Sequence, residues 1–131
     1  MGLNVFSVLF FQLSGLLNRD RVQSVLVLNG SDPHSVMAIQ ILIKKLNVSM
    51  ITCTTDSFEN QKFLQEHFTN QQMNIVFTPT ERDTFQRCID ITNGLGYDLI
   101  LDFGGSIEHM KRQCLKLISF YGIIATTYQD L

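Results

Sequence analysis

The residues that could do chemistry gather first in a loop between a short apolar run, 24–28, and the helical pattern that follows it. A glycine after such a run allows a sharp turn and a close approach of the backbone to a ligand. The start of the following helix offers N–H groups and a partial positive charge to a phosphate. Serine and histidine side chains can add hydrogen bonds or charge. The candidate phosphate-binding residues of this loop are Gly30, Ser31, His34, Ser35 and Val36.

Several features of the same loop oppose a phosphate site. Dinucleotide-binding loops usually carry two more glycines, whereas residues 33–36 are Pro, His, Ser and Val. Pro33 has no N–H group to donate, and the carboxylate of Asp32 would repel a pyrophosphate. Ser31, Asp32 and Ser35 are equally suitable as helix caps. Two alternatives therefore stay open: a nucleotide site, or a purely structural start of a helix.

A second polar cluster follows the branched apolar run 48–53. At this point of a dinucleotide-binding fold an acidic residue suits the ribose of NAD, and small polar or basic residues suit the extra phosphate of NADP. Thr54, Ser57 and Lys62 favour NADP. Asp56 lies about six residues beyond the usual spacing from Gly30 and is a weak signal for NAD. The alternative is a solvated turn that caps the next helix.

A third candidate follows the apolar run 98–102, where Phe103 and the pair Gly104-Gly105 would let a ligand approach the backbone. Glycine pairs are also ordinary turn residues. The sequence shows no Ser–His–Asp, Cys–His or paired-carboxylate arrangement, so we predict no catalytic residue. The single histidines His67 and His109 have no spaced partners, and we predict no metal site.

Apolar runs alternate with helical patterns along the chain, which predicts βαβ crossovers and an α/β fold with a doubly wound parallel sheet of about five strands in the order 3-2-1-4-5. Ligands bind such sheets beyond the carboxyl ends of the strands, where the winding reverses. The three candidate clusters meet there. The expected strands are 24–28, 48–53, 74–77, 98–102 and 122–126, and the expected helices are 36–46, 59–68, 82–92 and 107–118.

Composition narrows the class of protein. With 131 residues, 45% hydrophobic and 17% charged, the chain fits one globular domain spanning 1–131. A net charge of -2 gives no indication of the basic surface that binds nucleic acid. The three cysteines, Cys53, Cys88 and Cys114, form no CxxC pair. They indicate a reducing, cytoplasmic setting without disulfides.

The first 18 residues are very apolar, with Phe6, Leu9, Phe10, Phe11 and Leu13 close together. They lack the basic start of a signal peptide and are shorter than the ~20 residues of a membrane span. We expect a lead-in helix, 1–18, that is buried against the domain or against a covering partner. Association with a membrane is the alternative.

Several segments carry a resemblance to a known family. The runs 25–30 (VLVLNG), 38–42 (AIQIL), 50–52 (MIT) and 114–124 (CLKLISFYGII) resemble the nucleotide-binding domain of medium-chain dehydrogenases and reductases. The strongest match is 92–105 (TNGLGYDLILDFGG), which resembles the family's signature before and along its fourth strand. Within the family, the chain looks most like the zinc-independent, zeta-crystallin-like quinone oxidoreductases.

The resemblance implies a Rossmann-type domain that binds NADPH, in proteins that pass its hydride to a quinone or enone without a metal. The family's phosphate-binding Ser and Lys map near Ser57 and near Gln61 or Lys62, and its nicotinamide side maps to the backbone at Phe103 and Gly104. The chaperonin-10-like catalytic domain and the sixth strand are absent from this sequence.

We therefore expect a fragment, splice product or degenerate relative with weak or no activity of its own. A non-catalytic interaction or scaffold domain that has lost the cofactor is the alternative. A homo-oligomer is a further expectation.

Overall fold

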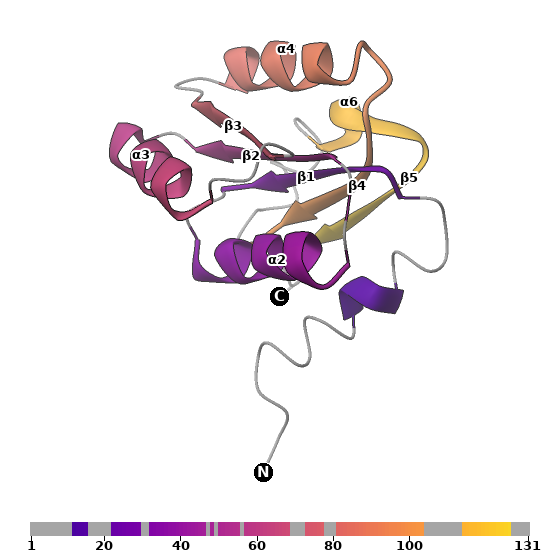
Figure 1. Cartoon of the computed structure of the whole chain (residues 1–131). Coiled ribbons are helices and arrows are strands. Elements are labelled where there is room, and N and C mark those ends of the chain that lie inside the picture. The colour runs from indigo at the N-terminus through magenta and orange to yellow at the C-terminus, as the bar shows by residue number, and fades with distance from the viewer. Residues whose placement is uncertain are drawn as a thin grey trace, which may run out of the picture.

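Five parallel strands form the centre of the chain and pair in the order β3-β2-β1-β4-β5 (Figure 1). This computed structural model describes residues 12–15, 22–29, 32–46, 48, 50–55, 57–68, 73–77, 81–103 and 114–126. The strands are β1 (Ser24–Leu28), β2 (Met50–Thr55), β3 (Met73–Phe77), β4 (Tyr97–Asp102) and β5 (Ile118–Thr126). The helices between them are α2 (Pro33–Lys44), α3 (Phe58–His67), α4 (Glu81–Ile91) and α6 (Leu115–Leu117). The predicted α/β class, parallel pairing and strand order are confirmed.

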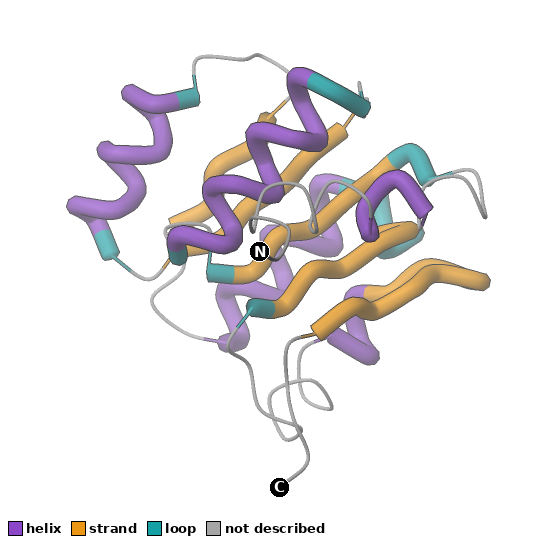
Figure 2. The backbone as a smooth tube through the Cα atoms, turned by 90° about the horizontal axis from the view of Figure 1, so that it is seen from below, coloured by secondary structure: helices purple, strands orange, loops and turns teal. Residues whose placement is uncertain are grey.

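The sheet is the middle layer of three. Helices α2 and α3 cover one face, and α4 and α6 cover the other (Figure 1); Figure 2 shows the strands side by side between them. Because successive side chains of a strand point to opposite faces, β1 supplies both cores. Val25 and Val27 pack in the cluster that contains α2 residues, and Leu26 and Leu28 pack in the cluster that contains Cys88 of α4. Burial on both faces explains why β1 is apolar throughout.

Residues 12–15 are helical, and Leu13 is only 1% exposed. Its side chain belongs to the same core cluster as Ile39 and Leu42 of α2. The remainder of the lead-in helix expected over 1–18 lies outside the described residues. In the described part of the chain, no helix has the length and apolar character needed to cross a membrane.

The last strand begins earlier than the sequence indicates. We predicted a helix to residue 118 and a strand from residue 122, but β5 starts at Ile118 and the described part of the helix is α6 alone. Tertiary contacts explain the difference, because Ile118 pairs with Tyr97 and the Ser119 hydroxyl donates to the Asp98 carboxylate at 2.9 Å. The register then shifts between Tyr97 and Leu99. Residues 107–113 of the predicted helix lie outside the described residues.

Asp98 ties together the amino ends of three strands. Its carboxylate accepts the backbone N–H groups of Gln23 and Ser24 at 3.0 and 3.3 Å, besides the hydroxyl of Ser119. The Ser24 hydroxyl in turn accepts the Asp98 N–H at 3.1 Å. Asp98 is thus a structural residue at the edge opposite to the candidate site.

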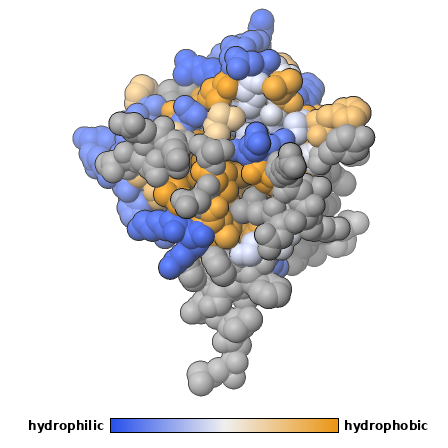
Figure 3. Space-filling view, turned by 45° about the vertical axis from the view of Figure 1, so that its right-hand side comes forward, coloured by the Kyte–Doolittle hydropathy of each residue, from blue (hydrophilic) through white to orange (hydrophobic). Residues whose placement is uncertain are grey.

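Apolar side chains also reach the surface on the side of the molecule that carries β5 and α6 (Figure 3). Leu115 is 54% exposed and Phe120 of β5 is 87% exposed. Both belong to the end of the chain that lies beyond β4. The expectation of a homo-oligomer stays a prediction.

Because three cysteine thiols are buried, we predict that the folded protein loses stability at alkaline pH. Burial raises the pKa of Cys53, Cys88 and Cys114 to about 12, from an ordinary value of 9.0. Above pH 9 the unfolded chain releases these protons while the folded chain keeps them, so stability is full below pH 9 and falls as pH rises toward 12. At pH 10 we expect a loss of about 1.4 kcal/mol per thiol.

Urea unfolding at pH 7, 9 and 10 measures this loss. A Cys53→Ala variant should show a shallower decline than the parent chain. An unfolding free energy that stays constant from pH 8 to pH 10 would contradict the assignment of these thiols as protonated core groups.

Candidate functional site

The candidate site lies at the carboxyl edge of the sheet, where β1 is flanked by β2 on one side and β4 on the other. The crossover from β1 leads to β2 on one side, and the crossover from β3 returns to β4 on the other side, so the winding reverses at β1. In sheets of this kind ligands bind beyond the carboxyl ends of the strands at this point, next to the loops after β1, β2 and β4. Asn29 follows β1 with a left-handed φ of 58°, a conformation that Asn adopts more readily than most residues. Its N–H donates to the Thr54 hydroxyl of β2 at 3.3 Å. The structure thus places Thr54 beside the end of β1.

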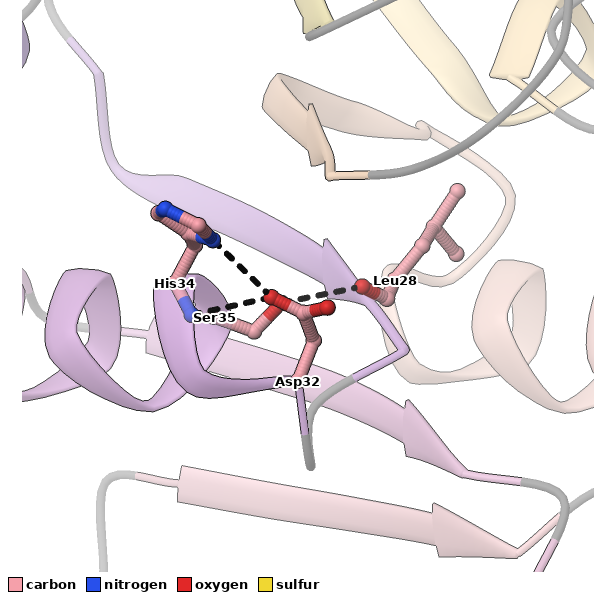
Figure 4. A network of polar contacts seen from close by, with 4 residues as sticks. All are labelled: Leu28, Asp32, His34 and Ser35. Atoms are coloured by element: carbon pink, nitrogen blue, oxygen red, sulfur yellow. Dashed lines mark hydrogen bonds and ion pairs between the residues drawn. The ribbon is translucent and has the colours of Figure 1, made fainter.

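Helix α2 starts at this edge of the sheet and is capped by its own chain (Figure 4). Asp32 is the N-cap, and its carboxylate accepts the N–H of His34 at 2.9 Å. Pro33 holds the first helical position, where a missing N–H costs nothing. The Asp32 N–H donates to the carbonyl of Asn29 at 3.1 Å and closes the turn. The cap and the proline explain why α2 begins three residues before the helix predicted from residue 36.

His34 links the start of α2 to the end of β4. Its Nδ1 lies 3.4 Å from Oδ1 of Asp32, which is an ion pair when the imidazole is protonated. The ring also stacks on Phe103, with 6.0 Å between the ring centroids and 22° between the planes. The structure therefore brings together two predicted site residues that are 69 positions apart.

Ser35 and Val36 face inward. The Ser35 side chain is fully buried, and its hydroxyl donates to the carbonyl of Leu28 at 3.4 Å, as Figure 4 shows. Val36 packs against the core cluster of α2. In this arrangement both side chains fasten the helix to β1, and contact with a ligand there would come from backbone groups. Gly30, Ser31 and Gly104 lie outside the described residues.

The start of α3 repeats the cap on the β2 side of this edge. Ser57 is the N-cap, and its hydroxyl accepts the N–H of Asn60 at 3.3 Å. The N–H of Ser57 donates to the Thr55 hydroxyl at the same distance. Lys62 follows on the exposed side of α3. Helix α3 itself begins at Phe58, close to the predicted start at residue 59.

The sequence did not reveal two contacts at this edge. One is the pairing of Asp32 with His34, for which the only sequence signal is an acid and a histidine around Pro33. The other is Asp102, only 3% exposed, whose Oδ2 lies 3.9 Å from Sγ of Cys114. Burial, and then the negative charge of Asp102, raise the pKa of the Cys114 thiol to about 12. That thiol is therefore a protonated donor and not a nucleophile.

Across the described stretches of the chain, no three His, Cys, Asp or Glu residues gather into a metal-binding group. His67 instead accepts or donates a hydrogen bond with Gln40 at 3.0 Å and stacks on Phe63. His109 lies outside the described residues.

Comparisons with known proteins agree with this geometry at the level of the fold. No family model matches the sequence, and no curated protein sequence matches it. Among solved structures, the D-arabinose dehydrogenase of Sulfolobus solfataricus is 21% identical, with a TM-score of 0.67 over 90% of this chain and 34% of that one. The mycobacterial protein Rv1454c, solved with NADPH, is 17% identical, with a TM-score of 0.73 over 95% of this chain and 36% of that one.

The JamJ enoyl reductase is also similar, at 18% identity and a TM-score of 0.75 over 96% of this chain and 35% of that one. The chain thus spans about a third of the length of these three structures, and 71% of a putative enoyl reductase domain of polyketide synthase that is 17% identical with a TM-score of 0.68. These neighbours are medium-chain dehydrogenases and reductases, the family that the sequence resembles. This chain therefore has the Rossmann-type fold of the medium-chain dehydrogenases and reductases.

Proposed function

We propose that this chain is the NADPH-binding domain of a zinc-independent, quinone oxidoreductase-like protein. The observation that carries the proposal is the carboxyl edge of the sheet at β1, where the start of α2, the capped start of α3 and Phe103, which follows β4, come together. Solved structures of the same fold support it, since one was determined with NADPH and another is described as a mycobacterial quinone oxidoreductase.

Each part of this edge suits a different part of the dinucleotide. The start of α2 provides the partial positive charge that favours a pyrophosphate. Ser57 and Lys62 on the β2 side offer hydroxyl and ammonium groups for the 2′-phosphate of the adenosine. Thr54 is only 6% exposed and its hydroxyl accepts the Asn29 N–H, so it would hold the end of β1 in place. On the β4 side, Phe103 would border the nicotinamide. Two residues at the start of α2 do not fit: Pro33 has no N–H to donate, and the carboxylate of Asp32 already accepts the N–H of His34.

Bound NADPH would supply a hydride, and this chain's residues would bind and orient the nucleotide. Transfer to a quinone or enone also needs an acceptor held close to the nicotinamide. The D-arabinose dehydrogenase and Rv1454c are each about three times as long as this chain. We therefore propose that the chain alone has weak or no oxidoreductase activity, and that hydride transfer belongs to a longer protein.

Titration with NADPH and NADH, followed by nucleotide fluorescence and melting temperature, tests the proposal. A ligand that binds only the folded state raises the melting temperature as its concentration exceeds its Kd. We expect millimolar NADPH to raise it more than NADH does. Unchanged melting and fluorescence with millimolar NADPH would contradict the proposal.

Lys62 gives this test a matched pair of variants. Lys62→Gln should weaken NADPH binding about tenfold and leave NADH binding unchanged, since one charge–phosphate contact is on the order of 1.4 kcal/mol. Lys44→Gln is the control, because Lys44 lies in the last turn of α2, at the opposite edge of the sheet. Equal losses for both nucleotides would place Lys62 away from the 2′-phosphate.

A non-catalytic interaction or scaffold domain is the second candidate function. The observation that favours it is the cap on α2, because Asp32 already takes a donor that a pyrophosphate would need. The same titration separates the two candidates. A cytoplasmic location remains a prediction from the sequence.

A further inference from the structure

The N–H groups of His34 and Val36, at the start of helix α2, are already in use within the chain. In a phosphate-binding helix the first N–H groups point at the ligand. Here Pro33 has none, and the N–H of His34 donates to Oδ1 of Asp32 at 2.9 Å. Val36 donates its N–H to the Asp32 carbonyl at 2.9 Å, as in any helix. The carboxylate of Asp32 therefore stands at the helix end where an anionic ligand would bind.

The side chain of His34 is held by the same carboxylate. Its Nδ1 lies 3.4 Å from the oxygen that accepts its backbone N–H, and Figure 4 shows both contacts converging on Asp32. The Asp32 side chain is 30% exposed and that of His34 is 59% exposed, so solvent and ligands can reach the pair. Stacking on Phe103 fixes the ring across the ends of β1 and β4. The backbone N–H and the imidazole of His34 are both suited to bind a phosphate, but both already contact the carboxylate of Asp32.

We propose that Asp32 is an intramolecular stand-in for the pyrophosphate and sets the affinity of this site for the nucleotide. NADPH must displace the carboxylate from the His34 N–H and then bind next to its negative charge. The inference rests on the proposed function, because it assumes that the carboxyl edge at β1 binds a dinucleotide. The loop departs from the glycine-rich pattern, and the effect of this departure on nucleotide affinity is assigned to Asp32.

Asp32→Asn tests the inference, because asparagine is an equally good N-cap but carries no charge. Asp90→Asn is the matched control: it changes the net charge equally, in the last turn of α4 at the opposite edge, where Asp90 accepts from Gln86 at 2.9 Å. The Kd for NADPH is measured by calorimetry in the parent chain and both variants. Melting without ligand confirms that each variant is folded, and Asp32→Ser provides a second neutral cap if Asp32→Asn is unstable.

We expect Asp32→Asn to lower the Kd for NADPH at least tenfold and Asp90→Asn to leave it within twofold of the parent value. If the parent chain binds NADPH and Asp32→Asn binds it equally well, the inference is overturned and the proposed function stands. Equal tightening in both variants also overturns it, since net charge would then be the cause. If neither the parent chain nor any folded variant binds NADPH, the proposed function is wrong and the inference with it.

Discussion

Replacing Gly96 with alanine should lower the free energy of unfolding by about 3 kcal/mol, through backbone strain and a steric clash together. Gly96 has a left-handed φ of 81°. A Cβ atom there would lie 2.8 Å from the carbonyl carbon of Ile118 and 2.8 Å from the carbonyl oxygen of Leu117. These are backbone atoms at the start of β5, which cannot move aside as a flexible side chain could. Thermal or urea unfolding measures the loss.

Gly94 is the matched control for Gly96. It has an almost identical φ of 84°, but a Cβ there would meet nothing within 4 Å. Gly94→Ala should therefore cost only the strain of a left-handed alanine, about 1 to 2 kcal/mol. The difference between the two variants isolates the contact between Gly96 and β5. Equal losses would contradict the observed approach of β5 to the turn before β4.

Truncating Leu13 to alanine should cost about 2 to 5 kcal/mol, the range for a leucine removed from a packed core. Leu13 is 1% exposed and lies in the cluster formed with Ile39 and Leu42 of α2. The variant would leave a cavity between residues 12–15 and the domain. Urea unfolding, with a check that the slope against urea is unchanged, gives the value.

Leu95→Ala is the control for Leu13, because Leu95 is 77% exposed and its truncation should change stability by less than about 0.5 kcal/mol. If Leu13→Ala also changed stability so little, the apolar start of the chain would not be part of the core. An apolar segment that interacts with a membrane or a partner would then be the better account of it.

The order of strands could be predicted from the sequence because burial on both faces marks each strand. Residues 24–28 were predicted and observed with the same bounds, since β1 is buried along its whole length. Strand β2 lies two residues later than predicted, at Met50–Thr55. In the register between β2 and β1, Met50 pairs with Ser24. Thr54 and Thr55, whose residue type suggests a loop, are buried at the end of β2.

The polar contacts of the site could be predicted only in part. Local signals gave Asp32 as one of three candidate caps and a turn before α3 as a capping segment, because a cap depends on residues two to four positions apart. They placed the start of the first helix at residue 36, three residues after its observed start. The stacking of His34 on Phe103 joins residues far apart in sequence and follows from the β1–β4 pairing. The early start of β5 likewise depends on Asp98 and Tyr97, which no local pattern contains.

Mapping NADPH onto the chain by amide chemical shifts in two-dimensional NMR tests the central claim most directly. The claim is that the nucleotide binds across the carboxyl edge of the sheet, at β1. Saturating NADPH should shift the amides of Asn29, His34, Ser57 and Phe103, and leave Gln23 and Asp98 at the amino edge unchanged. Shifts confined to the amino edge, or no shifts at millimolar NADPH, would contradict it.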